Sequence, residues 1–550
     1  MTRPNPSNII GCWHPGETPP EPFAAAVQEA LLNVARPIYV VEQGPGLALS
    51  QSGTGELGAA ARPSGNGLLL RAFVPPLRPE GLGDAAFKAA HGLTYAYVAG
   101  EMANGITSVR MVSAAGKAGM VGFFGAGGLM LSEVEAAVDR LQREAPGIPF
   151  GVNLIHSPGN PELEMALAEL FLRRKVRLIS ASAYVEPNLP LVYFRAKGLH
   201  RTAAGRTVGL NRIVAKVSRV EVARKFLAPP AAKHLSRLVE LGRISADEAA
   251  LAATLPLATD LTAEADSGGH TDNRPAITLL PTMLALRDEI AARHGYERPP
   301  CVGLAGGIAT PESTAAAFAL GAAFVLTGSI NQGCVEAGTS EAVGAMLAEA
   351  GQADVAMAPA ADMFELGVKV QVLKRGTMFP YRAAKLYELY TSYAGYDQIP
   401  GQQREILERD FFRCSFDQEW EQTRRFFMQR DPKQVDRARV DPKHKMALVF
   451  RSYLGRSSIW AIQGEPTRRI DYQVWCGPAM GAFNQWVKGS FLEAPANRRT
   501  VEVALNLLFG AAVATRANWL RAQGIAIPAG AGAIRPLALE AIQKRVEAFS

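Results

Sequence analysis

Glycine and hydroxyl residues follow two consecutive apolar runs near the middle of the sequence. The run CVGLA precedes Gly306 and Gly307, and the run AAFVL precedes Thr327, Gly328 and Ser329. Glycines let backbone amides approach an anion, a helix N-terminus adds partial positive charge, and a hydroxyl completes the shell. The two segments therefore predict a pocket for a phosphate group. The alternative is that these glycines only permit tight turns.

A third segment, EADSGGHTDNRP, brings an ionisable side chain next to small residues. Ser267, Gly268 and Gly269 precede His270. Histidine exchanges protons near neutral pH, and the glycine pair would let a flat ring lie against the backbone. We expect His270 to take part in proton transfer; the alternative is a histidine that only satisfies hydrogen bonds within the fold. No second histidine at helical spacing supports a metal site.

Polar or small residues also follow or interrupt three other apolar runs. Met102, Ala103 and Asn104 form a small-residue turn that could contact the edge of a flavin ring. Asn153 interrupts the run PFGVNLI and needs partners if buried, which a flavin pyrimidine ring would supply. Lys216 in VAKVS could stabilise negative charge on a reduced flavin. A purely structural role is the alternative for each of these three sites.

The elements that must position these residues are eight short apolar runs that alternate with helical segments between about residues 92 and 332. This alternation predicts an α/β fold, a TIM (β/α)8 barrel with the candidate residues at the carboxyl ends of its strands. A doubly wound open sheet is the alternative. We expect a small N-terminal α+β cap over residues 1–90, the barrel over 91–334 and a C-terminal helical region over 335–550. A helical insertion at about 231–254, before the sixth strand, is expected to form a lid or substrate wall.

The bulk composition is that of an ordinary soluble protein. The 550 residues are 48% hydrophobic and 20% charged with a formal net charge of +7, and five cysteines are scattered without CxxC pairs. We therefore expect a cytoplasmic protein with no nucleic-acid partner, no export signal and no membrane insertion. The chain contains one GxGxxG pattern, Gly53, Gly55 and Gly58, which we interpret as a hairpin or loop because Pro63 follows too soon for a dinucleotide-binding helix.

Several of these segments resemble a known family. GEMANGITSVRMVSAAGKAGMVGFFGAGG, PFGVNLI, EADSGGHTDNRP and LAGGIAT with VLTGSI are similar to the superfamily of nitronate monooxygenases and FMN-dependent enoyl-acyl carrier protein reductases. KVSRVEVARKFLAP, ADMFELGVKVQVLKRGTMFPYRAAKLYELY and WCGPAMGAFNQWVKGSFLE resemble the PfaD family within it, the trans-acting enoyl reductases of polyunsaturated-fatty-acid and polyketide synthases.

This resemblance implies FMN as cofactor, NADPH or NADH as hydride donor, and an enoyl thioester on an acyl carrier protein as substrate. By motif it implies a phosphate pocket at Gly306, Gly307, Gly328 and Ser329, and a catalytic role for His270. It also implies that the flavin ring lies on Met102, Ala103, Asn153 and Lys216.

Two other functions are compatible with the same site: a nitronate monooxygenase that oxidises nitroalkanes, and a flavin-bearing scaffold of a synthase. The acyl chain, the pathway, the choice of nicotinamide and a possible homodimer are left open by the sequence.

Overall fold

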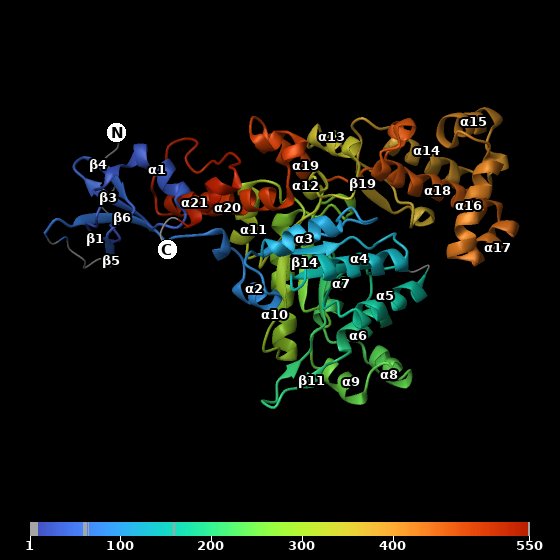
Figure 1. The fold of residues 1–550 in the computed structure, drawn as a ribbon, viewed down its shortest axis with the longest axis horizontal. Helices are drawn as coiled ribbons and strands as arrows, with labels where there is room; N and C mark the ends of the chain where they lie inside the picture. The colour runs from blue at the N-terminus through green and yellow to red at the C-terminus, as the bar shows by residue number, and fades with distance from the viewer. Residues whose placement is uncertain (1–8, 59–62, 64, 158–159, 548–550) are drawn as a thin grey trace.

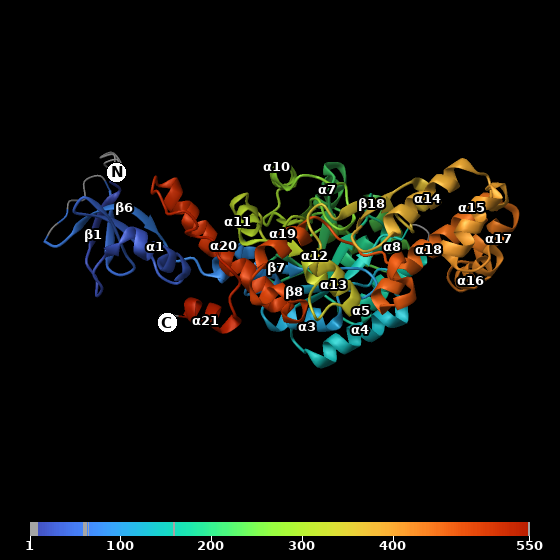
Figure 2. The ribbon, with the colours of Figure 1, turned by 90° about the horizontal axis from the view of Figure 1, so that it is seen from above.

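A computed structural model of the chain describes residues 9–58, 63, 65–157 and 160–547. The chain forms an elongated molecule with a β-rich N-terminal unit at one end, a barrel in the middle and a helical layer that runs over the barrel to the other end (Figure 1; Figure 2).

Eight parallel strands close into a barrel in the order β10-β13-β14-β16-β17-β7-β8-β9, which confirms the TIM-barrel prediction. Each predicted apolar run is one of these strands. They are β7 Tyr97–Ala99, β8 Val121–Phe124, β9 Phe150–Ile155, β10 Leu178–Ser182, β13 Arg212–Val217, β14 Asp260–Glu264, β16 Cys301–Ala305 and β17 Val325–Thr327. The surrounding helices are α2 Ala85–His91, α3 Val109–Lys117, α4 Leu131–Glu144, α5 Pro161–Arg173, α6 Leu189–Ala196, α7 Val220–Leu227, α10 Ala276–His294 and α11 Pro311–Ala319.

The insertion before the sixth strand is helical, but it lies at the wrong end of the barrel for a lid. It consists of α8 Ala232–Glu240 and α9 Ala246–Ala252, which pack on α6 and near the hairpin of β11 His200–Arg201 and β12 Thr207–Val208. These elements lie below the barrel in Figure 1, opposite the C-terminal helices. An insertion between a helix and the next strand emerges at the amino ends of the strands, whereas barrel sites lie at the carboxyl ends. The interpretation as a lid or substrate wall is therefore wrong.

The N-terminal unit is a six-stranded sheet with one helix. The sheet has the order β2-β4-β3-β6-β1-β5. Its elements are β1 Gly11–His14, β2 Glu21–Pro22, α1 Phe23–Leu32, β3 Ile38–Gln43, β4 Gly46–Ser50, β5 Thr54–Leu57 and β6 Leu68–Val74. The GxGxxG pattern forms β5 and its flanks, and β5 pairs with β1 at the sheet edge. The pattern therefore opens no helix, as expected.

The C-terminal region begins with a short β-structure that the sequence analysis did not predict. Strands β18 Val355–Pro359 and β19 Lys369–Leu373 pair with each other, and β19 also pairs with β15 Gly269–His270 from the loop after the sixth barrel strand. The following helices are α14 Phe379–Ser392, α15 Gly401–Ile406, α16 Phe416–Arg430, α17 Pro432–Val440, α18 Pro442–Gln463, α19 Ala479–Val487, α20 Thr500–Ala522 and α21 Leu539–Glu547. Two shorter helices, α12 Ser329–Gln332 and α13 Glu341–Ala348, connect the barrel to this region.

Helix α20 joins the barrel to the N-terminal unit. It packs along α11, and the fully buried Arg516 donates hydrogen bonds to the carbonyls of Leu31, Asn33 and Arg36 near the end of α1. By length and composition α20 could cross a membrane, but 78% of its most apolar stretch is buried inside the structure. It is therefore a core helix.

Candidate active site

Three charged side chains from three strand ends meet in the barrel mouth. The Nζ of Lys216 lies 3.2 Å from Oε1 of Glu101 and 3.2 Å from Oε1 of Glu264, and Ser180 Oγ donates to the same Glu101 oxygen at 2.9 Å. Burial lowers the pKa of Lys216, but the two carboxylates outweigh burial and leave that pKa raised. Lys216 is thus a paired ammonium group within a cluster of net negative charge. The role predicted for Lys216, stabilisation of negative charge on a reduced flavin, stays a prediction.

Asn153 lies in the same mouth with its orientation fixed. Its amide nitrogen donates to Ser180 O at 3.1 Å and to Ser182 Oγ at 2.9 Å, and the side chain is buried. Among the described residues none donates to its carbonyl oxygen. That oxygen is therefore available to a donor group of a bound ligand.

The turn after the first barrel strand is held by close backbone contacts. Thr107 Oγ1 accepts from the amide of Met102, and the amide of Asn104 donates to Gly127 O at 2.7 Å. Asn104 has a φ of 56°, a conformation that few non-glycine residues adopt. Ala103 lies between them at the rim, half-buried. The turn is therefore rigid and presents small side chains, as a surface for a flat ring requires.

The loop that carries the Gly-Gly-His sequence is clasped by two C-terminal segments. Gln371 Nε2 donates to Asp266 Oδ1 at 2.8 Å and to Ser267 O at 2.7 Å. A Cβ atom at Gly268 would lie 2.8 Å from the backbone nitrogen of Cys476, so this glycine makes room for residues 475–477. Gly269, with a φ of 81°, meets only Trp475 at 4.0 Å. Gly268 is thus required by close packing against the backbone of Cys476, whereas the space beside Gly269 is open.

His270 faces a carboxylate that comes from the C-terminal region. Its Nε2 lies 3.2 Å from Asp362 Oδ1, an ion-pair distance without the alignment of a hydrogen bond. Burial lowers the pKa of His270, but Asp362 and, more weakly, Glu264 outweigh this and leave the pKa raised above its ordinary value. The imidazole therefore keeps its proton to a higher pH than a free histidine.

The glycines after the seventh and eighth strands differ in the space that lies above their backbone. Gly306 has a φ of 85° and allows close approach to Ala265 and Asp266, with which any Cβ would collide at 2.7 Å. Gly307, with a φ of 75°, and Gly328 would each accept a Cβ with no heavy atom within 4 Å. The Gly306 position therefore serves chain packing, and the backbone at Gly307 and Gly328 is open to a bulky group.

The two hydroxyl residues at the end of the eighth strand, Thr327 and Ser329, differ in the hydrogen bonds that they can make. Ser329 Oγ accepts from the amide of Gly477 at 3.1 Å, so its own hydrogen remains to be donated elsewhere. Thr327 is buried, and its hydroxyl contacts Tyr97 OH at 2.6 Å and accepts from Asn331 Nδ2 at 2.9 Å. The side chain of Thr327 thus lies in the barrel interior. A ligand at this strand end would contact Gly328 and Ser329 instead.

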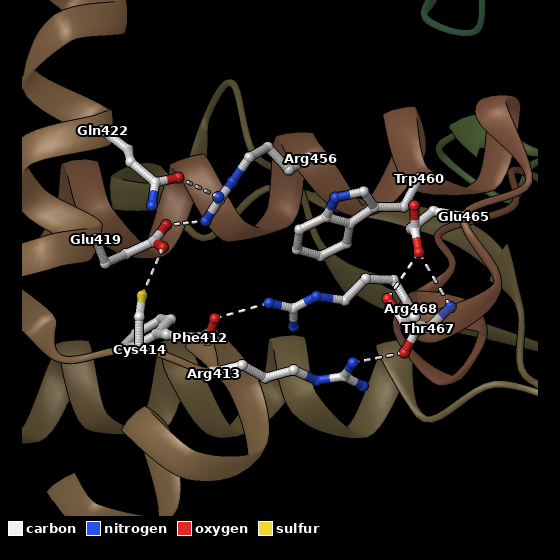
Figure 3. A pocket seen from close by; sticks show the side chains of 10 residues that line it. All are labelled: Phe412, Arg413, Cys414, Glu419, Gln422, Arg456, Trp460, Glu465, Thr467 and Arg468. Atoms are coloured by element: carbon white, nitrogen blue, oxygen red, sulfur yellow. Dashed lines mark hydrogen bonds and ion pairs between the residues drawn. The ribbon is translucent and has the colours of Figure 1, made fainter.

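A separate polar cavity of about 410 Å³ lies among the C-terminal helices (Figure 3). There Arg468 donates to the carbonyls of Phe411 and Phe412 and lies 4.4 Å over the ring of Trp460, and Arg456 pairs with the buried Glu419. Arg468 thus satisfies the end of a π-helical turn, Leu407–Phe412, and Arg456 is neutralised by α16. The cavity is therefore explained by local structure, and it contains none of the candidate residues.

Sequence reasoning missed the residues that complete the site from a distance. Asp362, Gln371 and Gly477 lie in or beside the two segments ADMFELGVKV and WCGPAM, which resemble the PfaD family but contain no motif of known chemistry. Glu101 precedes the predicted Met102 turn and was also missed. The available signal was a carboxylate two residues after the end of a buried apolar strand, β7.

Comparison with known proteins identifies the class. The sequence profile of nitronate monooxygenase matches residues 86–395, and that of the inserted helical domain of [acyl-carrier-protein] S-malonyltransferase matches residues 393–472. The first match covers more than half of the chain, including the whole barrel. The chain therefore belongs to the nitronate monooxygenase family.

Relatives within that family narrow the assignment. The structure of the enoyl reductase domain of MlnA, from the macrolactin biosynthesis cluster of Bacillus amyloliquefaciens, superposes with a TM-score of 0.77 at 40% identity over 80% of this chain and 99% of that one. Polyketide biosynthesis protein PksE of Bacillus subtilis is 46% identical over 79% of the chain, and a polyunsaturated fatty acid synthase polypeptide of Thraustochytrium sp. is 44% identical over 82%. The chain spans 56% and 30% of the lengths of these two relatives. By sequence it is a PfaD-like member of the nitronate monooxygenase family.

Proposed function

We propose that the chain uses FMN and NADPH or NADH to reduce the α,β-double bond of enoyl thioesters, which an acyl carrier protein presents in polyketide or polyunsaturated-fatty-acid biosynthesis. The observation that supports this most directly is the pairing of an open glycine cradle after β16 and β17 with a carboxylate-held histidine after β14. The first suits a flavin phosphate and the second suits proton donation.

The residues of the mouth fit FMN. Backbone amides around Gly307 and Gly328 and the Ser329 hydroxyl would hold the phosphate, because no side chain fills the space above them. The flavin ring would lie on the turn at Met102 and Ala103. The free carbonyl oxygen of Asn153 would accept from a ring N–H.

The chemistry that bound FMN supplies is hydride transfer from the nicotinamide to the β-carbon of the enoyl thioester. The α-carbon then needs one proton, so that enoyl thioester, NAD(P)H and a proton give the saturated thioester and NAD(P)⁺. His270 would hold this proton on its imidazole, and Asp362 would keep it protonated and oriented. The Lys216 cluster would fix the floor of the mouth rather than donate to the substrate.

The carrier protein as substrate donor is supported by the relatives. Two of them are named for polyketide or polyunsaturated-fatty-acid biosynthesis, and the profile over residues 393–472 is named for an enzyme that acts on acyl-carrier-protein. These names belong to longer proteins or to other enzymes, and they motivate the choice of substrate for the test.

The test compares two assays on the purified flavoprotein. Under anaerobic conditions with NADPH or NADH, a carrier-bound enoyl chain should gain two mass units by mass spectrometry. The family also contains nitronate monooxygenases, so the second assay supplies a nitroalkane in air. Turnover of the nitroalkane without reduction of the enoyl chain would refute the reductase proposal, and oxidation of the nicotinamide without either product would leave a flavin-bearing scaffold.

A further inference from the structure

One stretch of the C-terminal region stands out for its charge and its exposed apolar side chains. Residues 424–440, the second half of α16 together with α17, contain six basic and two acidic residues, a net charge of +4. Their basic residues are Arg424, Arg425, Arg430, Lys433, Arg437 and Arg439. We call residues 424–440 the basic hairpin.

Large apolar side chains on the basic hairpin are left in solvent. Phe426 is 47% exposed, Met428 43% and Val440 83%. The guanidinium of Arg430 lies 4.7 Å over the ring of Phe426. Exposed aromatic and methionine side chains surrounded by arginine are the composition typical of protein interfaces.

Local ion pairs neutralise only part of the charge. Arg424 and Arg425 share Glu421, Arg437 pairs with Asp441, and Arg439 pairs with Asp436. Lys433 has no acidic partner among the described residues, and Arg425 remains 74% exposed despite its pair. The hairpin therefore presents a positive surface to solvent.

This surface reaches the rim of the barrel mouth. Arg430 Nη2 donates to the carbonyl of Gly128, in the loop after β8, at 3.5 Å. Gly128 is in turn close to Asn104 of the candidate flavin turn, since a Cβ added at Gly128 would collide with Asn104 Oδ1. A protein bound on the hairpin would thus be adjacent to the mouth, where a flexible arm can deliver a substrate.

We propose that the basic hairpin is the docking surface for the acyl carrier protein. This inference rests on the proposed function for the identity of the partner. A net charge of +2 remains when Glu421 and Asp441, which pair with the hairpin, are counted with it. A small domain with an acidic helical surface is complementary to this charge, and it would cover the exposed Phe426 and Met428. The contact is a transient one that combines electrostatic steering with a small apolar centre.

The experiment measures binding and turnover separately. The variants are the double charge reversal Arg425→Glu/Lys433→Glu and, separately, Phe426→Ser. The matched control is Arg298→Glu, an exposed arginine that precedes β16 at the amino end of the barrel. Binding of a crotonyl-loaded acyl carrier protein is followed by fluorescence anisotropy at low and high salt. Turnover is compared between that carrier and crotonyl-N-acetylcysteamine, which has the thioester without the protein.

We expect the double reversal to weaken carrier binding by about 10-fold or more at low salt, with a smaller difference at high salt. Phe426→Ser should weaken binding at both salt concentrations. Turnover of the small thioester should stay unchanged in both variants. The docking surface would be overturned if the variants bound the carrier with unchanged affinity, or if Arg298→Glu weakened binding equally. It would also be overturned if sedimentation showed that the variants change self-association of the chain while carrier binding stays the same. Intact carrier binding without reduction of either thioester would instead contradict the proposed function.

Discussion

The replacement Gly307→Val tests whether the backbone after the seventh strand holds the flavin phosphate. Gly307 has a φ of 75° and lies where a Cβ meets no heavy atom within 4 Å. Valine therefore introduces no clash in the protein itself, but the left-handed conformation costs about 1–2 kcal/mol for an L-residue and more when the side chain is branched. This cost should appear as a lower thermal midpoint.

The effect on the cofactor is separate and larger. The branched side chain would stand in the space above the amides and break one or two hydrogen bonds to a charged phosphate, each contributing about 1.5–3 kcal/mol. Loss of one such bond weakens FMN binding roughly 10- to 100-fold, because about 1.4 kcal/mol corresponds to a factor of ten. Titration of the apoprotein with FMN, followed by quenching of flavin fluorescence, measures this directly.

A matched control separates strain from contact. Gly147 has a φ of 80°, also has nothing within 4 Å of its added Cβ, and precedes β9 at the amino end of the barrel. Gly147→Val should lower the thermal midpoint by a similar amount and leave FMN affinity unchanged. If Gly307→Val bound FMN as tightly as Gly147→Val, the phosphate would have to lie elsewhere.

Three further outcomes are expected around the histidine loop. His270→Ala should retain FMN and reduce the enoyl thioester at least roughly 10²-fold more slowly, the usual contribution of a general acid, and unchanged turnover would remove His270 from the mechanism. Asp362→Asn should lower the pKa of His270, so the fall in rate as pH rises through that pKa should begin at a lower pH; a pH–rate profile identical to that of the unmodified enzyme would contradict the role of Asp362. Hydrogen bonds from Arg219 hold the pKa of Asp272 at about 2. The ionised carboxylate therefore stabilises the fold fully at pH values above the ordinary aspartate pKa of about 3.9. This stabilisation is lost as the pH falls toward 2. Asp272→Asn should therefore reduce the acid sensitivity of the thermal midpoint in that window, and an unaltered slope would show that the pair is not formed.

The barrel could be predicted from sequence because its strands are short apolar runs, most of them with a glycine or polar residue directly after the run. The parallel strands of a barrel are buried on both faces, so the runs are nearly continuous in hydrophobicity and easy to delimit. Because the ends of the strands could be located, the residues that follow them, such as Gly307 and His270, could be predicted to lie at one mouth of the barrel.

The remaining parts of the site depend on contacts between segments far apart in the chain. Gln371 reaches Ser267 across 104 residues, and Gly477 reaches Ser329 across 148. No local pattern encodes such a contact. Strands β18 and β19 were missed for a related reason, since they are short and lie in a region whose periodicity is otherwise helical. The insertion α8–α9 was predicted to be helical from its composition. Its position at the amino ends of the strands depends instead on its place in the chain, after a helix and before the next strand.

The clasp between the Gly-Gly-His loop and residues 475–477 sets an order of events during synthesis of the protein. The ribosome completes the eighth barrel strand well before it reaches Gly477, whose amide caps Ser329. At roughly 5–20 residues per second, the intervening 148 residues take about 7–30 s to translate. During that interval a nascent barrel has its strands but lacks the wall that fixes its histidine loop. The loop would therefore reach its final position, and hold the flavin proposed above, only after residues 475–477 have been synthesised.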